Sequence, residues 1–520
     1  MLRDGDELAL IDVREQGVFS KEHLLFAVCI PLSRLELDFA DLVPRLGTRI
    51  VLVDEGDEAK LSETAAERLR GFGYNDVSVL TGGVSGWRAE GYELFSGVNV
   101  PSKAFGEFVE NTYDTPRLTA DEVRAKLDAG DKMVILDSRP YDEYHRMNIP
   151  GGIDTPGAEL VYRVHDIAPD PDTFVLVNCA GRTRSIIGAQ SLINAGIPNQ
   201  VAALKDGTMG WHLAGHQLEH GSDRVAGPPS ADGLEKAKAA AARVAERFGV
   251  RRVDRATLAA WQAEADSRTL YLLDVRSPAE FEAGHLAGSS NAPGGQLVQA
   301  TDEYIATRGA RVVLADDAGV RATMTASWLI QMGWDDVYVL DGGIGDDGSE
   351  TGPRAPTVLD GEQGDLISPN ELKAVLDSGE PVAVVDLATS LEYRARHIPG
   401  AWWAVRSRFP SGLFRLPPVG LIVLTSPDGL LAHLAVKDAA AARPGLLIRV
   451  LDGGTDAWVA AGLPTVEGMD YLTTETDDVW YKPYEHKDAI EKFMRDYLTW
   501  EVALVEQIER DGDAKFRSFA

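Results

Sequence analysis

Cysteine is scarce in this sequence. Only Cys29 and Cys179 occur among 520 residues, too few for a disulfide framework or a cysteine-based zinc site. We therefore expect a reducing compartment, the cytoplasm, and no metal. Long hydrophobic runs are also missing, because no stretch approaches the roughly 18 apolar residues of a membrane helix. Residues 1–7 are mostly charged and lack the apolar segment of a secretory signal. The sequence predicts a cytoplasmic protein with no membrane partner.

Positive charge is in deficit. The chain has 51 Lys+Arg against 81 Asp+Glu, a formal net charge of −30. Such a surface repels phosphate backbones, which argues against nucleic acid as a partner. The apolar share of 44% and charged share of 25% are ordinary for globular proteins, and this length favours three or four domains.

One unit recurs four times along the chain. An aspartate closes an apolar run at Asp12, Asp137, Asp274 and Asp386, and a leucine precedes a glycine-rich turn at Leu80, Leu204, Leu340 and Leu451. The spacing from the aspartate to the leucine is nearly the same in all four units. An aromatic residue follows each aspartate by seven positions, at Phe19, Tyr144, Phe281 and Tyr393. Spacings this regular indicate tandem copies of one fold.

Each unit alternates strands with helices, the pattern of a parallel sheet covered on both faces. We expect an α/β protein with domains at residues 1–100, 115–222, 230–346 (including a preceding helix) and 364–468. Ligands of such sheets bind beyond the carboxyl ends of the strands. Capping boxes at Thr119 and Ser368 open units two and four, at the same spacing ahead of Asp137 and Asp386. Asp12 stands too close to the start of the chain for an equivalent cap, so unit one lacks an opening helix. We hypothesise that the natural start lies upstream.

Residues 469–520 are predicted to be a helical tail. Apolar residues recur there at helical spacing: Ile490, Phe493, Met494, Tyr497, Leu498, Leu504, Val505 and Ile508. The stripe has two interpretations, a helix docked on its own chain or a helix that forms a homodimer.

The loop after the second strand of unit two carries the candidate chemistry. Cys179 stands between an apolar strand and a helix, followed by Ala180, Gly181, Arg182, Thr183 and Arg184. Unpaired N–H groups and the positive end of the helix dipole favour a thiolate and could cradle an anion. We expect Cys179 to be the nucleophile. Arg184 is expected to bind an anionic donor, and Arg182 is either a second anion-binding residue or a solvated surface residue. Cys29 lies in an apolar run and is interpreted as a small buried residue.

These patterns resemble the rhodanese (sulfurtransferase) family. The resemblance rests on Asp137-Ser138-Arg139, on Cys179 to Ser185 and on the Gly-Gly-x-x-x-Trp endings, and it covers residues 1 to about 468. It implies four tandem domains with mostly parallel five-stranded sheets, and a cysteine that carries a sulfane sulfur as a persulfide. Related phosphatases have C-x5-R, whereas this loop is C-x4-R with Ser185 at the sixth position, which argues against phosphatase or arsenate reductase activity.

The other three units lack the nucleophile. Asp54, Asp316 and Ser426 stand at the cysteine position. We expect units one, three and four to be inactive, unit one to pack on unit two, and units three and four to form a second pair. Asp137 and Arg139 have counterparts in inactive units, which favours a structural role in a salt-bridged corner. Ser185 is likewise assigned near the site as a structural residue.

The leading hypothesis is a sulfurtransferase without metal or organic cofactor. Its partners would be a sulfur-containing anion or a persulfide donor, and a thiol or protein acceptor. The alternative is a sulfur carrier or protein-binding scaffold with little turnover. The sequence leaves the natural donor and acceptor open.

Overall fold

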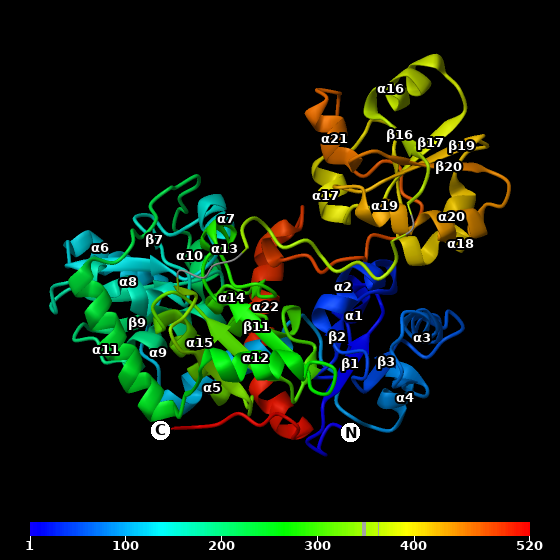
Figure 1. The fold of residues 1–520 in the computed structure, drawn as a ribbon. Helices are drawn as coiled ribbons and strands as arrows, with labels where there is room; N and C mark the ends of the chain where they lie inside the picture. Colours follow the sequence, from blue (N-terminus) through cyan, green and yellow to red (C-terminus); the bar gives the residue numbers. More distant parts are fainter. Residues whose placement is uncertain (346–349, 362, 520) are drawn as a thin grey trace.

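A computed structural model describes residues 1–345, 350–361 and 363–519. Four α/β units, each built on a five-stranded sheet, are followed by one long C-terminal helix (Figure 1). The predicted fold class is confirmed. The predicted end of unit three, residue 346, and the last tail residue, 520, lie outside the described residues.

Each anchor aspartate ends a central strand whose side chains are mostly buried. These strands are β1 (Leu8–Asp12), β6 (Met133–Asp137), β11 (Leu270–Asp274) and β17 (Val382–Asp386). The remaining strands are β2 (Val28–Cys29), β3 (Ile50–Val53), β4 (Val77–Val79), β5 (Arg117–Leu118), β7 (Ile153–Asp154), β8 (Phe174–Asn178), β9 (Val201–Leu204), β10 (Arg251–Val253), β12 (Ser290–Asn291), β13 (Thr307–Arg308), β14 (Arg311–Ala315), β15 (Val337–Leu340), β16 (Leu366–Ile367), β18 (Trp402–Trp403), β19 (Leu421–Thr425) and β20 (Leu447–Leu451).

Helices cover the sheets and join the units. Units one and two contain α1 (Gln16–Phe19), α2 (Leu35–Leu42), α3 (Leu61–Gly71), α4 (Gly83–Ala89), α6 (Ala120–Ala129), α7 (Tyr141–Arg146), α8 (Glu159–Ile167), α9 (Thr183–Ala195) and α10 (Gly207–Leu213). Units three and four contain α12 (Arg255–Ala263), α13 (Pro278–Ala283), α14 (Gly294–Gln299), α15 (Val320–Gln331), α16 (Pro369–Ser378), α17 (Ser390–Ala395), α18 (Phe409–Gly412), α19 (Leu430–Leu434), α20 (Val436–Ala442) and α21 (Gly454–Ala460). The joining helices are α5 (Val100–Tyr113), α11 (Ala231–Phe248) and α22 (Ile490–Asp511). Both predicted capping boxes, at Thr119 and Ser368, are present.

The sheets of units two, three and four are parallel. In unit two the order is β5-β9-β8-β6-β7, which places the carboxyl ends of β6 and β8 side by side. The first sheet differs, because its edge includes β13 from unit three, antiparallel to β1 with Leu8 opposite Arg308. Unit one therefore completes its five strands with a segment from a distant part of the chain.

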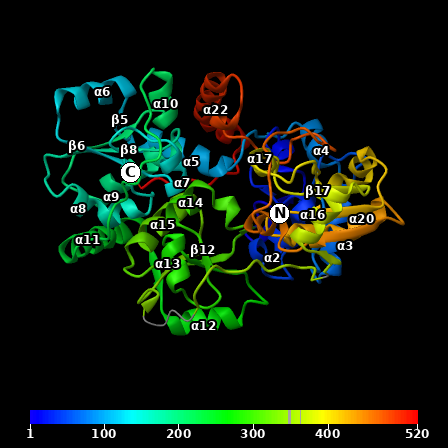
Figure 2. The ribbon, with the colours of Figure 1, turned by 90° about the horizontal axis from the view of Figure 1, so that it is seen from above.

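The pairing of units differs from the expectation. Unit two packs on unit three: α11 lies against α8 and α15, and Phe105 and Ile186 share a core with strands of unit three. Unit one packs on unit four, where Leu37 enters the core of unit four and Arg406 bonds Glu36. Figure 2 separates the two groups. The predicted pairing of neighbouring units is therefore wrong. The alanine-rich face of α11 is buried between units two and three and joins them instead.

The C-terminal tail returns to unit two. After unit four the chain passes through a short 3₁₀ turn at Pro483–Glu485 into α22, which packs along α5. Leu504 and Ile508 join Phe95 and Ala104 in one apolar cluster. The interpretation as a helix docked on its own chain is confirmed. Within the described residues, no helix is long and apolar enough to cross a membrane.

Candidate active site

Cys179 lies in a tightly built turn between β8 and α9. It is buried, with 2% of its surface exposed, and its carbonyl accepts hydrogen bonds from the Thr208 amide at 2.8 Å and the Thr208 hydroxyl at 2.9 Å. Gly207 has a φ of +56°, and a Cβ there would collide with the carbonyl oxygens of Cys179 and Gly181. The glycine at this repeated turn is therefore needed for close backbone approach.

Helix α9 begins just after the cysteine loop, at Thr183. No side chain caps its first turn, so its N-terminal amides are not satisfied by a capping group. Amides at a helix N-terminus attract negative charge. The predicted anion-binding loop, Ala180 to Arg184, thus stands at the carboxyl end of the sheet, where the parallel fold was expected to place a ligand.

Arg182 is neither solvated nor free. Only 7% of it is exposed, and its guanidinium bonds Glu107 at 2.6 Å, Glu110 at 2.5 Å and Asp206 at 3.1 Å. The surface interpretation is wrong, because the helix α5 supplies two carboxylates that the repeat pattern did not reveal. A substrate-binding role for Arg182 stays a prediction, and its charge is already balanced by these acids.

Arg184 lines the cavity beside Cys179. Its guanidinium bonds the Glu143 carboxylate at 2.8 Å and the Gln296 side-chain oxygen at 3.0 Å. Lys482 also lies 3.3 Å from Glu143. Burial acts to raise the pKa of Glu143, but the charges of Arg184 and then Lys482 hold this pKa well below its usual range. Glu143 is therefore a fixed anion that orients two cations.

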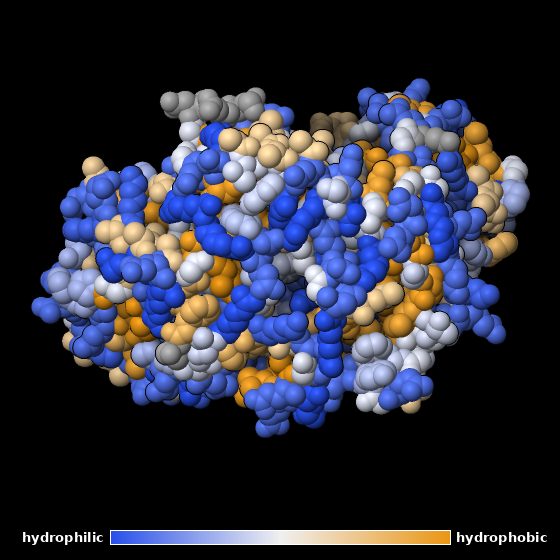
Figure 3. All heavy atoms as spheres, turned by 60° about the horizontal axis from the view of Figure 1, so that its bottom comes forward, coloured by the Kyte–Doolittle hydropathy of each residue, from blue (hydrophilic) through white to orange (hydrophobic). Residues whose placement is uncertain are grey.

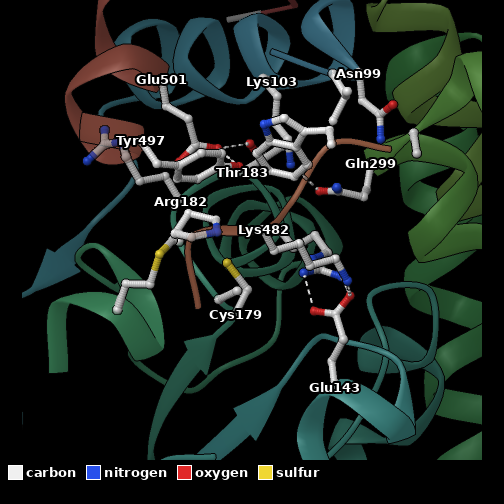
Figure 4. Close-up of a pocket in the computed structure, with 18 of the residues that line it drawn as sticks. Asn99, Lys103, Glu143, Cys179, Arg182, Thr183, Gln299, Lys482, Tyr497 and Glu501 are labelled. Carbon is white, nitrogen blue, oxygen red and sulfur yellow. Dashed lines mark hydrogen bonds and ion pairs between the residues drawn. The ribbon is translucent and has the colours of Figure 1, made fainter. Parts of the chain in front are cut away.

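The cavity at Cys179 has a volume of about 220 Å³ and is assembled from several units. Unit one supplies Asn99, unit two the cysteine loop, unit three Gln299, and the tail Lys482 and Tyr497. Figure 4 shows these side chains converging around the sulfur. A site formed by segments this far apart depends on the packing of the whole chain.

The tail closes one side of this cavity with two residues of α22. The Tyr497 hydroxyl donates to the Glu501 carboxylate at 3.0 Å, and the Thr183 hydroxyl donates to it at 3.2 Å. Glu501 is 1% exposed, and burial raises its pKa. The other oxygen of Glu501 has no hydrogen-bond partner among the described residues. These contacts fix the tail to the loop that carries the cysteine.

A buried ion pair supports the strand end below the loop. Arg139 bonds Asp137 at 2.7 Å and the Met147 carbonyl at 2.6 Å, and the Asn178 amide donates to Asp137 at 2.9 Å. The salt-bridged corner expected from the sequence is thus present. The Ser185 hydroxyl donates to the Arg182 carbonyl at 2.8 Å, inside the first turn of α9.

In the units without a cysteine in this loop, an aspartate takes its position in two cases. The Asp316 carboxylate accepts from the Gly319 amide at 2.5 Å and the Arg321 amide at 2.8 Å. Asp54 accepts from the amides of Gly56 and Ser62, each at 2.9 Å. In these two loops the backbone amides therefore bond a carboxylate of the loop itself.

The second cysteine has a different setting. Cys29 is half-buried at the end of β2, its thiol lies 3.6 Å from the Arg14 carbonyl, and burial raises its pKa well above the usual range. A thiol that stays protonated is a poor nucleophile. Among the described residues, no cluster of potential ligands could hold a metal ion.

Several cavity residues were not predicted from the sequence. They are Asn99, Lys103, Glu143, Gln296, Gln299, Trp480, Lys482, Tyr484 and Glu501; Tyr497 was noted only as part of an apolar stripe. The predicted units one and two end at residue 100 and begin at residue 115, and α5 lies between them. Pro101 and the spacing of Ala104, Phe105 and Val109 are signals for the helix found there, but they do not reveal what Lys103 faces.

The family comparison agrees with this geometry. The family described as "Rhodanese-like domain" matches residues 1–90, 119–214, 255–346 and 368–461. The chain belongs to the rhodanese family, with four such domains in tandem.

Three individual proteins show which members of the family this chain is similar to. The crystal structure of thiosulfate sulfurtransferase from Pseudomonas aeruginosa is 54% identical, with a TM-score of 0.94, covering 99% of this chain and 97% of that one. Thiosulfate sulfurtransferase of Gallus gallus is 32% identical over 134 residues, 24% of this chain and 44% of that protein. The putative sulfur carrier protein YrkF of Bacillus subtilis is 26% identical over 102 residues, 19% of this chain and 54% of that protein. The chain spans about half the length of these two curated relatives.

Proposed function

We propose that this protein is a thiosulfate sulfurtransferase that works through a persulfide on Cys179. The carrying observation is the position of Cys179, at the uncapped N-terminal end of α9 in a cavity with several cationic side chains. The full-length similarity to the Pseudomonas aeruginosa enzyme supports the same substrate.

The first half-reaction exchanges one S–S bond for another. The Cys179 thiolate attacks the outer, sulfane sulfur of thiosulfate, and an S–S bond forms to the cysteine. The S–S bond within thiosulfate breaks, and its electron pair leaves with sulfite. The loop amides from Ala180 to Arg184 face the resulting persulfide anion, which they stabilise as they would an oxyanion.

The second half-reaction returns the enzyme to its starting state. The lone pair of a thiophilic acceptor attacks the outer sulfur, the persulfide S–S bond breaks, and the thiolate of Cys179 is released. Cyanide is the acceptor for an assay, with thiocyanate as the product. A thiol or a protein acceptor fits the same chemistry in the cell, where two free cysteines suit a cytoplasmic location.

The residues around Cys179 have separate roles in this scheme. Arg184, held in place by Glu143, points its charge into the cavity for the anionic donor. Arg182, bound by Glu107 and Glu110, fixes the loop between α5 and α9. Asp137 and Arg139 hold the strand end, and no step of the scheme passes through a metal or organic cofactor.

A sulfur carrier with little turnover is the second candidate. The observation that favours it is the buried cysteine, which a large acceptor reaches only if the tail moves. With this second candidate we also propose a homodimer, which would form through the side of α22 on which Val502 is exposed.

Intact mass spectrometry tests the function. After incubation with thiosulfate, the protein should gain one sulfur atom that cyanide removes. The Cys179→Ser variant should gain none and lose steady-state transfer by at least about 10³-fold, because the nucleophile is gone. Cys29→Ser is the matched control and should behave as the unmodified protein. Sulfur found on Cys29, or transfer that survives in Cys179→Ser, would refute the proposal.

A further inference from the structure

Lys103 is a buried cation beside Cys179 with no carboxylate partner among the described residues. It lies in the first turns of α5 and is 7% exposed, and its ammonium donates to the Gln299 side-chain oxygen at 2.9 Å. Within residues 1–345, 350–361 and 363–519, no acid lies within ion-pair distance of it. An ammonium has three donors, so one hydrogen bond leaves most of its capacity unused.

The other cations of the cavity differ in this respect. Arg182 is bound by three acids, and Arg184 and Lys482 share Glu143. Each of these three cations thus has at least one acid partner in the protein, although Arg184 and Lys482 have only one carboxylate between them. Lys103 differs because no acid among the described residues pairs with it, and Figure 4 shows it on the wall opposite Glu143.

A buried unpaired ammonium is expensive for the folded state. Burial lowers the pKa of Lys103, and the charges of Glu501 and Cys179 act in the opposite direction. Glu501 is not within ion-pair distance of Lys103, and burial raises its own pKa. A buried lysine without an acid partner, in the wall of a cavity that holds a nucleophilic cysteine, indicates a role in binding an anion.

We propose that Lys103 and Gln299 form the subsite for the sulfonate group of the donor, and that the same subsite holds the sulfite product. This inference rests on the proposed function. Thiosulfate is a dianion, and its sulfonate needs donors some distance from the sulfur that Cys179 attacks. The Lys103 ammonium supplies charge, and the amide group of Gln299 supplies a second donor while its oxygen orients the lysine.

Unit three has no catalytic cysteine, but the subsite gives it a role in binding the donor. Gln299 ends α14 of unit three, and Lys103 comes from the helix that joins units one and two. Unit three therefore forms a wall of the donor site of unit two. The subsite selects donors with a compact anionic head over donors that lack one.

Thiosulfate binding to the Cys179→Ser variant tests the subsite without sulfur transfer. Isothermal titration calorimetry should show that adding Lys103→Met weakens thiosulfate binding at least about tenfold, because the unpaired charge is removed. Lys126→Met is the matched control, since Lys126 pairs with Asp131 outside the cavity, and it should leave binding unchanged. Equal binding with and without Lys103 would overturn the subsite.

A second variant separates anion recognition from a structural role. Gln299→Glu places a carboxylate where Lys103 now finds an amide oxygen, so the lysine gains the partner it lacks. We expect a higher melting temperature and weaker thiosulfate binding in this variant. Lys103→Met should also melt no lower than the parent when no anion is present, because it removes a buried unpaired charge. A marked loss of stability in both variants would show a structural role and overturn the proposal.

Failure of the subsite and failure of the proposed function give different results. If Lys103→Met forms the persulfide at the same thiosulfate concentrations as the parent, the subsite is wrong and the sulfurtransferase stands. If Cys179→Ser binds thiosulfate through Lys103 but the parent never gains sulfur, the subsite stands and the transfer is wrong.

Discussion

The buried aspartates at the strand ends show how the loss of an arginine partner changes the pKa of a carboxyl group. Asp12, Asp137 and Asp274 each bond an arginine two positions later at 2.7 Å. Unit four has Ala388 at that position, and Asp386 keeps only the Ala388 amide at 2.9 Å, with one oxygen unpaired among the described residues. Burial accordingly raises the pKa of Asp386 to about 7.

This difference predicts a pH dependence for unit four. Between about pH 4 and pH 7 the folded state keeps the Asp386 proton that the unfolded chain has lost, so the stability it contributes is complete at low pH and is lost as pH rises through 7. The side chain at position 386 of the Asp386→Asn variant stays neutral at every pH. The melting temperature of this variant relative to that of the parent should therefore be higher at pH 8 than at pH 5. Asp274→Asn is the contrast, since it leaves Arg276 unpaired and should melt lower at both pH values. A constant difference between Asp386→Asn and the parent would contradict the assignment.

At the scale of elements, the position of α22 depends on one glycine. Gly97 has a φ of +90°, and a Cβ there would collide with the Trp500 ring of α22. The same helix carries Tyr497 and Glu501 into the cavity at Cys179. The contact therefore links the end of unit one to the geometry of the active site.

Gly97→Ala should displace α22 and lower sulfur transfer several-fold, although residue 97 is not in the cavity. We also expect faster alkylation of Cys179 by iodoacetamide, because the tail covers it less well. Gly91→Ala is the control: Gly91 has a φ of +80° with nothing within 4 Å, so it carries a backbone cost of about 1 kcal/mol and no collision. Equal activity in the two variants would show that α22 does not need this contact.

At the scale of the whole molecule, two pairs of units are held by different means. Units two and three share continuous apolar cores across α11. Units one and four meet through a polar lock, in which Arg406 of unit four bonds Glu36 of unit one at 2.7 Å and Arg68 of unit one bonds Asp438 of unit four at 2.8 Å. The face shown in Figure 3 is mainly hydrophilic, with hydrophobic patches between the hydrophilic side chains.

Breaking the polar lock should loosen unit four. Arg406→Met removes the buried arginine that joins Glu36 to unit four and leaves Glu36 with Arg68 of its own unit at 2.9 Å, so the contact between units one and four should weaken. Hydrogen–deuterium exchange should rise at residues 33–39 and 405–413. Arg396→Met removes an exposed pair with Asp456 in the same unit and should change little. Unchanged exchange in Arg406→Met would mean that the apolar contacts suffice.

Local patterns were enough for each unit taken alone. The anchor spacings predicted four copies, and the alternation of strands and helices predicted parallel sheets with the cysteine loop at their carboxyl ends. The capping boxes at Thr119 and Ser368 were read correctly because a cap involves residues three positions apart. Short local motifs also identified Cys179 and Arg184 in the loop and the Asp137–Arg139 pair at the strand end.

What the sequence determined by itself is therefore the repeated fold and the place of its one cysteine loop, since both follow from short-range periodicity. Only the tertiary structure decided that unit two pairs with unit three, that β13 completes the first sheet, and that α22 closes the cavity. It also decided that Arg182 is balanced by Glu107 and Glu110 while Lys103 is left without an acid among the described residues. These features depend on side chains from segments far apart in the chain, and no local spacing records which of them will meet.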